Sequence, residues 1–277
     1  MSTKSLVSDL SANTINKIGT AIQSALFFLV ISVWLTKDQL GIYAWCLSVA
    51  ALLAEMVTLG IHQPVVRRIA AGVQDASLVS GVALTSRSFL ALALALVSIP
   101  FLWFMREQIP NLGMLFYAYG AMVVWVIASV SQHVLQAKEK FWHMMVALQA
   151  GLMVKLLLGL LLVRLGYAVP GLFTALLVSS LIIGLLGFGM AARMVETPYL
   201  PRWNWAEFKQ LLKEGLPLLA SLLLGQALAR ADWILMRFYF NDGAVGEYAF
   251  AYRLYEFSWL PHAVCSTVLL PKLSYWL

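Results

Sequence analysis

Apolar residues fill long stretches of this chain without alternating with polar ones. The stretches from Phe89 to Phe104 and from Leu172 to Gly189 contain no charged residue. Because about 20 apolar residues in a helix cross the roughly 30 Å hydrocarbon core of a membrane, this pattern predicts membrane-spanning helices. It does not fit a transmembrane barrel, whose strands alternate apolar and polar residues. Eight spans are predicted, at about residues 14–35, 40–60, 79–103, 112–135, 142–164, 169–190, 215–238 and 245–270.

The composition supports the same class of protein. Of the 277 residues 61% are hydrophobic and 12% are charged, against about 45–50% and about 25% in soluble domains. A water-soluble globule is therefore excluded, and the predicted fold class is an all-α polytopic membrane protein. The net charge of +6 does not point to nucleic acid, because basic residues of a membrane chain first report its orientation. No nucleic-acid partner is expected.

Basic residues are distributed unevenly between alternate loops. The N-terminus and the second, fourth and sixth loops carry ten of them: Lys4, Lys17, Arg67, Arg68, Lys138, Lys140, Arg193, Arg202, Lys209 and Lys213. The first, third and fifth loops carry Lys37, Arg106 and Arg164. Since basic loops stay on the cytoplasmic side, we predict a cytoplasmic N-terminus and, after eight spans, a cytoplasmic C-terminus. The first 18 residues show no pattern of a cleaved signal peptide.

One internal repeat suggests how the spans are organised. Gly41-Ile42-Tyr43-Ala44-Trp45 opens the second span and Gly246-Glu247-Tyr248-Ala249-Phe250 opens the eighth, 205 residues later (246 − 41). Six spans lie within that offset, so the two copies have the same orientation, as in the parallel repeats of transporters. The predicted units are a complete six-helix lobe in 1–190, a cytoplasmic linker in 191–214, and the first two helices of a second, incomplete lobe in 215–277.

The linker contains an amphipathic stretch. Asn204 with Glu207 three residues later resembles a capping box. Apolar residues then recur at helical spacing: Trp205, Phe208, Leu211 and Leu212. This pattern predicts a separate helix that lies in the membrane interface.

Charged residues inside the spans are candidate functional residues, because a charge at the bilayer centre costs from about 2.5 kcal/mol upward. Lys155 lies near the middle of the fifth span, with Gly151 and Gly159 one turn to either side on the same face. The small neighbours favour a cationic group in a water-filled cavity. The alternative is a lysine in a tight helix contact, paired with an acid such as Glu55. Arg87 is expected at a membrane interface.

The seventh span carries two further charges. Arg230 shares a face with Gln226, whereas Asp232 points about 200° away from Arg230, so the two cannot pair within the helix. We expect Arg230 to face a cavity or another helix, where a guanidinium can bind phosphate oxygens through two hydrogen bonds. Asp232 is expected either to bond to a neighbouring helix or to carry a coupling ion.

The eighth span carries an aromatic stripe made of Tyr248, Tyr252, Tyr255 and Trp259. Such a stripe is either a wall that faces sugar or lipid, or ordinary helix packing. Arg253 and Glu256 lie three residues apart beside it. They are further candidates for ligand and ion binding, or they neutralise each other.

No catalytic or metal-binding motif is present in the sequence. The four histidines are scattered and the two cysteines lie in separate apolar stretches, so neither a metal site nor a cofactor is expected. A nucleophile elbow, a P-loop and a dinucleotide fingerprint are all absent from the sequence. We therefore expect a protein that is not an enzyme.

Several motifs occur in the order and spacing of a known family. They are Leu40-Gly41-Ile42-Tyr43, Leu59-Gly60 followed by Arg67-Arg68, and the stretch from Pro217 through Arg230, Asp232, Val245-Gly246-Glu247-Tyr248, Tyr252-Arg253, Pro261 and Pro271. Over nearly its whole length the chain resembles the polysaccharide biosynthesis, or O-antigen flippase, family of the multidrug/oligosaccharidyl-lipid/polysaccharide exporter superfamily. The resemblance implies two six-helix lobes around a central cavity, with cationic residues such as Lys155 and Arg230 holding the pyrophosphate of an undecaprenyl carrier. Members of the family have more helices than are predicted here.

The hypothesis is a flippase of the bacterial inner membrane that moves an undecaprenyl-pyrophosphate-linked oligosaccharide, such as an O-antigen unit of lipopolysaccharide, by alternating access. The expected anion-binding residues are Arg230, Lys155 and Arg253, and the candidate carriers of a coupling proton or sodium ion are Asp232, Glu55 and Glu256. Expected partners are the lipid-linked glycan, the glycosyltransferases and polymerase of the same pathway, and second-lobe helices from the rest of the native chain. The alternatives are a drug or cation exporter of the same superfamily, whose cavity would be dominated by carboxylates, and a non-transporting membrane scaffold for polysaccharide assembly.

Overall fold

The structure is a computed structural model that describes residues 3–72, 75–104, 111–194 and 201–258. Within these ranges all regular secondary structure is helical, which confirms the predicted all-α class. The helices are α1 (Thr3–Trp34), α2 (Lys37–Thr58), α3 (His62–Ala70), α4 (Ala76–Phe104), α5 (Leu112–Ala137), α6 (Phe141–Arg164), α7 (Ala168–Ala192), α8 (Trp205–Tyr239) and α9 (Asp242–Ser258). Six of them, α2 and α4 to α8, are long and apolar enough to cross a membrane. In α1 the shorter stretch Ile18–Trp34 is apolar.

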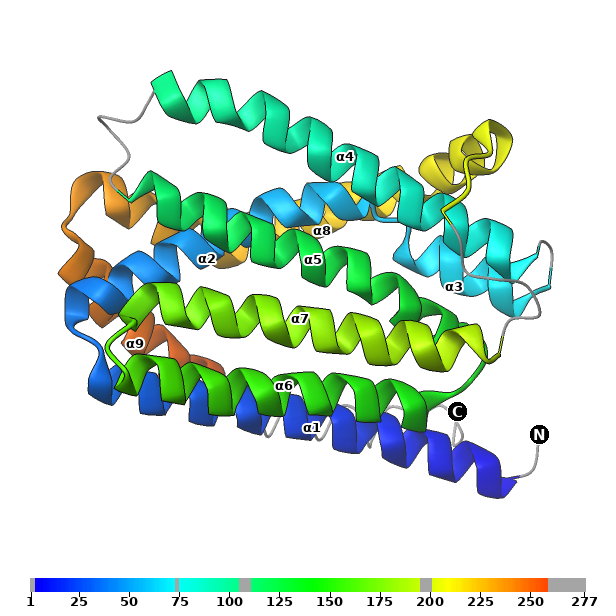
Figure 1. Cartoon of the computed structure of the whole chain (residues 1–277), viewed down its shortest axis with the longest axis horizontal. Helices are drawn as coiled ribbons and strands as arrows, with labels where there is room; N and C mark the ends of the chain where they lie inside the picture. Colours follow the sequence, from blue (N-terminus) through cyan, green and yellow to red (C-terminus); the bar gives the residue numbers. More distant parts are fainter. Residues whose placement is uncertain (1–2, 73–74, 105–110, 195–200, 259–277) are drawn as a thin grey trace, which may run out of the picture.

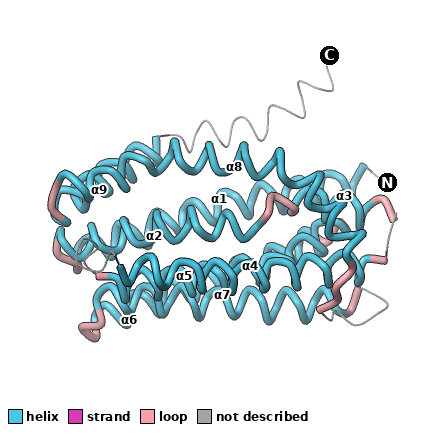
Figure 2. Tube along the Cα trace, turned by 90° about the horizontal axis from the view of Figure 1, so that it is seen from above, coloured by secondary structure: helices cyan, strands magenta, loops and turns pink. Residues whose placement is uncertain are grey.

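The helices run side by side between two distinct ends of the bundle (Figure 1). One end carries the α1–α2, α6–α7 and α8–α9 turns and is called the turn end below. The other carries α3 and the beginning of α8 and is called the α3 end. Seen from above, α8 and α9 form one layer, α1 and α2 a middle layer, and α4 to α7 a third (Figure 2). The middle layer therefore separates the C-terminal helix pair from most of the first lobe.

Among the described residues, two large apolar cores lie along the bundle, and a smaller one contains Ala54, Val57, Ala91 and Val126. The larger core joins both helix pairs, because it contains Phe28 and Leu40 of α1 and α2 together with Trp233 and Val245 of α8 and α9. The second core packs α3 against α4, α5 and α7, and α8 contributes only Leu211 to its buried residues. The pair α1 and α2 therefore shares a large core with the pair α8 and α9. In the second core, at the α3 end, α8 takes only a small part.

The two copies of the sequence repeat adopt the same local structure. The Thr36 hydroxyl accepts a hydrogen bond from the Gln39 N–H and caps α2. The Asn241 side chain accepts one from the Ala244 N–H, 2.9 Å away, at the start of α9. These caps lie 205 residues apart (241 − 36), the offset of the sequence motif. The first N–H groups of a helix have no partner within its own backbone. In both copies a cap side chain accepts a hydrogen bond from the N–H three residues later, and this stabilises the helix start.

The structure corrects the predicted element bounds at α1, which begins at Thr3 and not at about residue 14, and in two further places. Residues 61–78 were predicted as a loop, but they contain α3, whose nine residues are too few to give the signal of a span. The linker helix and the seventh span form the single helix α8, with Pro217 inside it. The Asn204 cap at its start is present, because the Glu207 N–H donates to the Asn204 side chain. The predicted span 245–270 continues past the last described residue, Ser258.

Candidate functional site

A cavity of about 280 Å³ lies midway along the bundle. Five helices line it, α2, α5, α6, α7 and α8, through Ala51, Ala54, Glu55, Met122, Trp125, Val126, Leu152, Lys155, Leu176, Ser179, Ile183 and Gln226. Most of this lining is apolar, with a few polar groups among it. That is the usual make-up of a small-molecule site, in which the polar groups orient the ligand.

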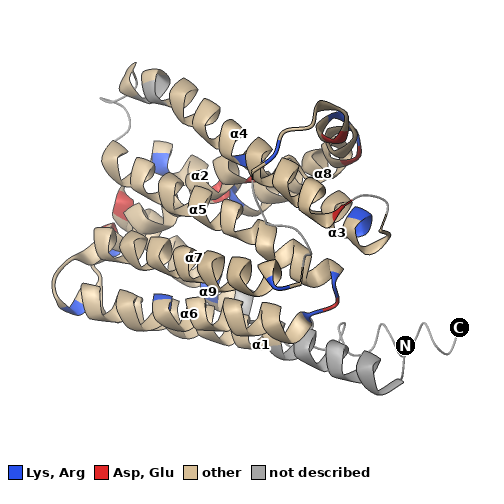
Figure 3. Ribbon diagram, turned by 45° about the vertical axis from the view of Figure 1, so that its right-hand side comes forward, with Lys and Arg blue, Asp and Glu red and all other residues tan. Residues whose placement is uncertain are grey.

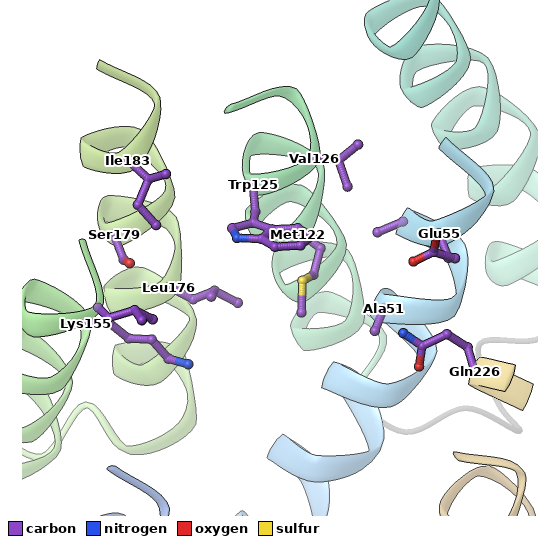
Figure 4. Close-up of a pocket in the computed structure, with 12 residues that line it drawn as sticks. Ala51, Glu55, Met122, Trp125, Val126, Lys155, Leu176, Ser179, Ile183 and Gln226 are labelled. Atoms are coloured by element: carbon purple, nitrogen blue, oxygen red, sulfur yellow. The ribbon is translucent and has the colours of Figure 1, made fainter. Parts of the chain in front are cut away.

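Lys155 and Glu55 are the two charged residues of the lining. They project from opposite sides of the cavity in the close-up view (Figure 4). The Lys155 ammonium lies 4.8 Å from the centroid of the Phe27 ring, a cation–π arrangement. The Glu55 carboxylate accepts a hydrogen bond of 3.2 Å from the Thr58 hydroxyl of its own helix. Among the described residues no ion pair joins Lys155 to Glu55.

The glycines beside Lys155 bring helices together. A methyl group at Gly151 would lie 3.0 Å from the Ser179 carbonyl oxygen of α7, and one at Gly159 would lie 2.7 Å from the Phe27 ring of α1. Both positions therefore allow close helix contacts, as small residues do in membrane proteins. The space next to Lys155 comes from the arrangement of the five helices, and not from the glycines to which the sequence interpretation attributed it.

Arg230 does not belong to the lining of this cavity, although Gln226 one turn earlier does. Its guanidinium lies 4.6 Å from the centroid of the Trp233 ring and 5.9 Å from that of Tyr252. Arg253 lies over the Phe28 ring at 5.3 Å and over Trp233 at 5.9 Å. The two arginines thus share Trp233 in one cluster between α8, α9 and α1, called the arginine–aromatic cluster below. Phe27 and Phe28 of α1 connect this cluster to Lys155.

Asp232 links two helices. Its carboxylate accepts a hydrogen bond of 2.6 Å from the Tyr248 hydroxyl of α9 and one of 2.9 Å from the Trp233 N–H. This is the geometry that a structural role requires, since a hydrogen-bonded carboxylate between two membrane helices holds them in register. The ring centroids of Tyr248 and Tyr252 are 6.1 Å apart and those of Tyr252 and Tyr255 are 5.9 Å apart, so these rings form a continuous row.

Two members of the predicted set cannot be placed. Trp259 lies outside the described residues, and Glu256 belongs to α9 but its side chain is not described. Of the predicted candidates, the structure brings Lys155 and Glu55 into the cavity. The structure gathers the other candidates outside the cavity, in the cluster between α8 and α9: Arg230, Arg253, Asp232, Tyr248 and Tyr252.

The sequence interpretation missed the burial of Arg87. Its side chain is 1% exposed, and it donates hydrogen bonds of 3.1 Å to the Val126 carbonyl and 3.0 Å to the Ser129 hydroxyl of α5. Arg87 is therefore an internal link between α4 and α5, and α5 forms a wall of the cavity. The signal was present, because a charge occurs eleven residues into α4, but sequence does not tell which face of α4 is covered.

A second missed cluster lies at the α3 end. Arg68 pairs with Glu207 through two contacts of 3.0 Å, and the exposed fractions of the two side chains are 6% and 4%. Glu214 accepts hydrogen bonds from both Arg67 and Arg68. The contact from Arg68 Nη2 to Glu207 Oε2 is a hydrogen bond between charged groups, and the contact from Nε to Oε1 is an ion pair. These contacts attach the first turns of α8 to α3.

Comparison with known proteins identifies the family. The chain matches the family described as "Polysaccharide biosynthesis protein" over residues 6–275. No curated protein and no solved structure matches it. The match covers nearly the whole chain, so the chain belongs to this family, as its motifs predicted.

Proposed function

We propose that this member of the polysaccharide biosynthesis protein family is a flippase that moves an undecaprenyl-pyrophosphate-linked oligosaccharide across the bacterial inner membrane by alternating access. The family and the membrane-spanning helices support a membrane transport role. The observation that carries the proposal is the mid-bundle cavity with Lys155 on its wall, at the place where α8 meets the first lobe. Transporters of repeat architecture bind substrate near the bilayer midplane between their repeats.

Charge supports an anionic substrate over a cationic one. Lys155 projects into the cavity, and Arg230 and Arg253 lie in the adjoining arginine–aromatic cluster. Among the acids whose side chains the structure describes, Asp232 accepts hydrogen bonds and Glu55 lines the cavity. An excess of fixed cations attracts phosphate groups. A drug or cation exporter would need the opposite balance.

The proposed orientation places the α3 end in the cytoplasm. Basic residues of this end include Arg67, Lys138 and Arg202, whereas α7, which runs between the two ends, carries no charged residue (Figure 3). Under this orientation the N-terminus is cytoplasmic and the turn end faces outward. The division into a first lobe, a linker and a second lobe is part of the same proposal. So is coupling to a proton or sodium ion, for which Glu55 is the candidate inside the cavity.

The test is the replacement of Lys155 by alanine, with Arg164→Ala on the exposed end of the same helix as the matched control. A hydrogen bond between charged groups contributes about 1.5–3 kcal/mol, which predicts a loss of flipping of about ten- to 100-fold. Flipping is measured as surface polysaccharide in cells and as translocation of the lipid-linked glycan in proteoliposomes. Arg164→Ala should leave both unchanged. Normal surface polysaccharide in Lys155→Ala would favour a non-transporting scaffold and contradict the proposal.

A further inference from the structure

We propose that the crossing of α2 and α9 at Gly41 and Gly246 is the gate that closes the cavity toward the turn end, and that it opens when these two helices separate. The ion pair between Lys37 and Glu247 spans the same crossing. The proposal rests on the proposed function for the role of the gate in transport, but its geometry and one of its tests do not depend on a substrate.

The contact between the two glycines is reciprocal. A methyl group at Gly41 would overlap the Asp242 carbonyl oxygen and lie 3.0 Å from the Gly246 nitrogen. A methyl group at Gly246 would overlap the Lys37 carbonyl oxygen and lie 3.1 Å from the Gly41 nitrogen. Lys37 and Asp242 are equivalent at the repeat offset of 205 residues. Each helix therefore contacts the other through the same position, as in a two-fold symmetric interface.

This symmetry places the crossing between the two repeats. Helices that approach with backbone against backbone leave no passage between them at the point of contact. A second cavity of about 280 Å³ lies beside the crossing, where Leu40, Gly246 and Phe250 are part of its lining. The crossing therefore closes the direct path between α2 and α9. Just inside it, Leu40 and Ala44 of α2 pack with Val245 and Ala249 of α9 in the shared apolar core. The cavity begins deeper along α2, at Ala51. A solute that leaves the cavity toward the turn end between the two repeats has to part α2 from α9.

The crossing is built so that it can open. No large side chain interlocks at the two glycines, and the association of membrane helices depends on close packing, since lipid is as apolar as their side chains. The side chains of Lys37 and Glu247 are 73% and 60% exposed, so water replaces their pairing at little cost. The caps at Thr36 and Asn241 keep each helix start intact on its own side. The two helices can thus separate as rigid bodies.

The first test joins the two helices covalently. Cysteines replace Lys37 and Glu247, whose side chains are in contact, in a full-length protein whose native cysteines are replaced by alanine. Oxidation should form the disulfide and reduce translocation of the lipid-linked glycan in proteoliposomes at least tenfold, and a reductant should restore it. The single variants Lys37→Cys and Glu247→Cys control for the substitutions themselves. Undiminished translocation by the cross-linked protein would overturn the gate.

The second test needs no substrate. Ser179→Cys in the cavity reports access when a membrane-impermeant maleimide is applied to either face of the membrane. Gly246→Ala should raise the labelling rate from the face that carries the α1–α2 turn at least threefold. The control is Gly225→Ala in α8, where a methyl group meets open space. An unchanged labelling rate in a membrane-inserted Gly246→Ala protein would contradict the gate. If Gly246→Ala does not insert into the membrane, the cross-linking test with cysteines at 37 and 247 decides whether the gate is correct.

The two tests separate this inference from the proposed function. If Lys155→Ala leaves surface polysaccharide unchanged while Gly246→Ala still opens Ser179→Cys to the reagent, the gate stands and the proposed substrate is wrong. If Lys155→Ala abolishes flipping while both gate tests are negative, the function stands and the gate is wrong.

Discussion

Both ends of α2 contact the C-terminal helices through glycines, but the ion pairs beside the two contacts differ in their exposure to solvent. At the turn end Gly41 faces Gly246, and the ion pair that joins α2 to α9 beside them, Lys37 with Glu247, is exposed. At the α3 end a methyl group at Gly60 would lie 2.5 Å from the Leu219 nitrogen, and one at Gly215 would lie 2.5 Å from the Leu59 carbonyl oxygen. The pair beside that contact, Arg68 with Glu207, is buried.

This difference assigns different mechanical roles to the two ends. An exposed pair exchanges its partner for water easily, whereas removal of one partner from a buried pair leaves an uncompensated charge. We therefore expect the α3 end to act as a fixed joint and the turn end as a separable one. The first turns of α8 belong mechanically to α3, although the sequence assigns them to a linker. Pro217 lies two residues after Gly215 within α8, at a position where membrane helices bend readily.

The largest effect is expected at the fixed joint. Glu207→Ala should destabilise the protein by about 3–5 kcal/mol, because Arg68 would then be buried with only the more distant Glu214. The measurement is thermal unfolding in detergent. The control is the double variant Arg68→Met with Glu207→Leu, which should recover most of the stability because no unpaired charge remains. Equal stability of Glu207→Ala and the parent protein would show that the α3 end is not a fixed joint.

A smaller effect is expected at the separable joint. Lys37→Ala should leave the midpoint of thermal unfolding unchanged and raise the labelling rate of Ser179→Cys about twofold from the face that carries the turn end, because an exposed ion pair contributes little. High salt should produce the same increase in the parent protein, since salt screens exposed charges. A large loss of stability in Lys37→Ala would show that the ion pair at the turn end also holds the helices together, as the buried pair at the α3 end does.

The smallest effect is expected from a covalent link across the fixed joint. Arg67→Cys with Glu214→Cys can be joined by a bifunctional maleimide, which spans the space that the two native side chains fill. The cross-linked protein should translocate the lipid-linked glycan within about twofold of the unlinked protein, because a joint that does not open during transport tolerates a covalent link. Inhibition as strong as that by the pair at Lys37 and Glu247 would mean that both ends of α2 open.

The resemblance to the family and the position of Lys155 in a cavity could both be proposed from the sequence. The neighbours of Arg230 and Arg87 could not, because both residues occur in apolar stretches of similar composition. Arg230 lies on the rings of Trp233 and Tyr252, and Arg87 is enclosed by α5. Which of these environments an arginine meets depends on the helix that packs against it. The same holds for Glu207, whose acid side chain was interpreted as part of a helix cap.

The sequence by itself determined that the protein is helical and membrane-spanning, and its repeated motif predicted that α2 and α9 have the same orientation. Apolar length, turn residues and a repeat offset are local properties, which persist whatever the helices pack against. Only the tertiary structure decided that Gly41 meets Gly246, that Gly60 meets Gly215, and that one of these contacts is backed by a buried ion pair. These features join residues roughly 140 to 205 positions apart. Their energies depend on burial, which no segment of the chain sets alone.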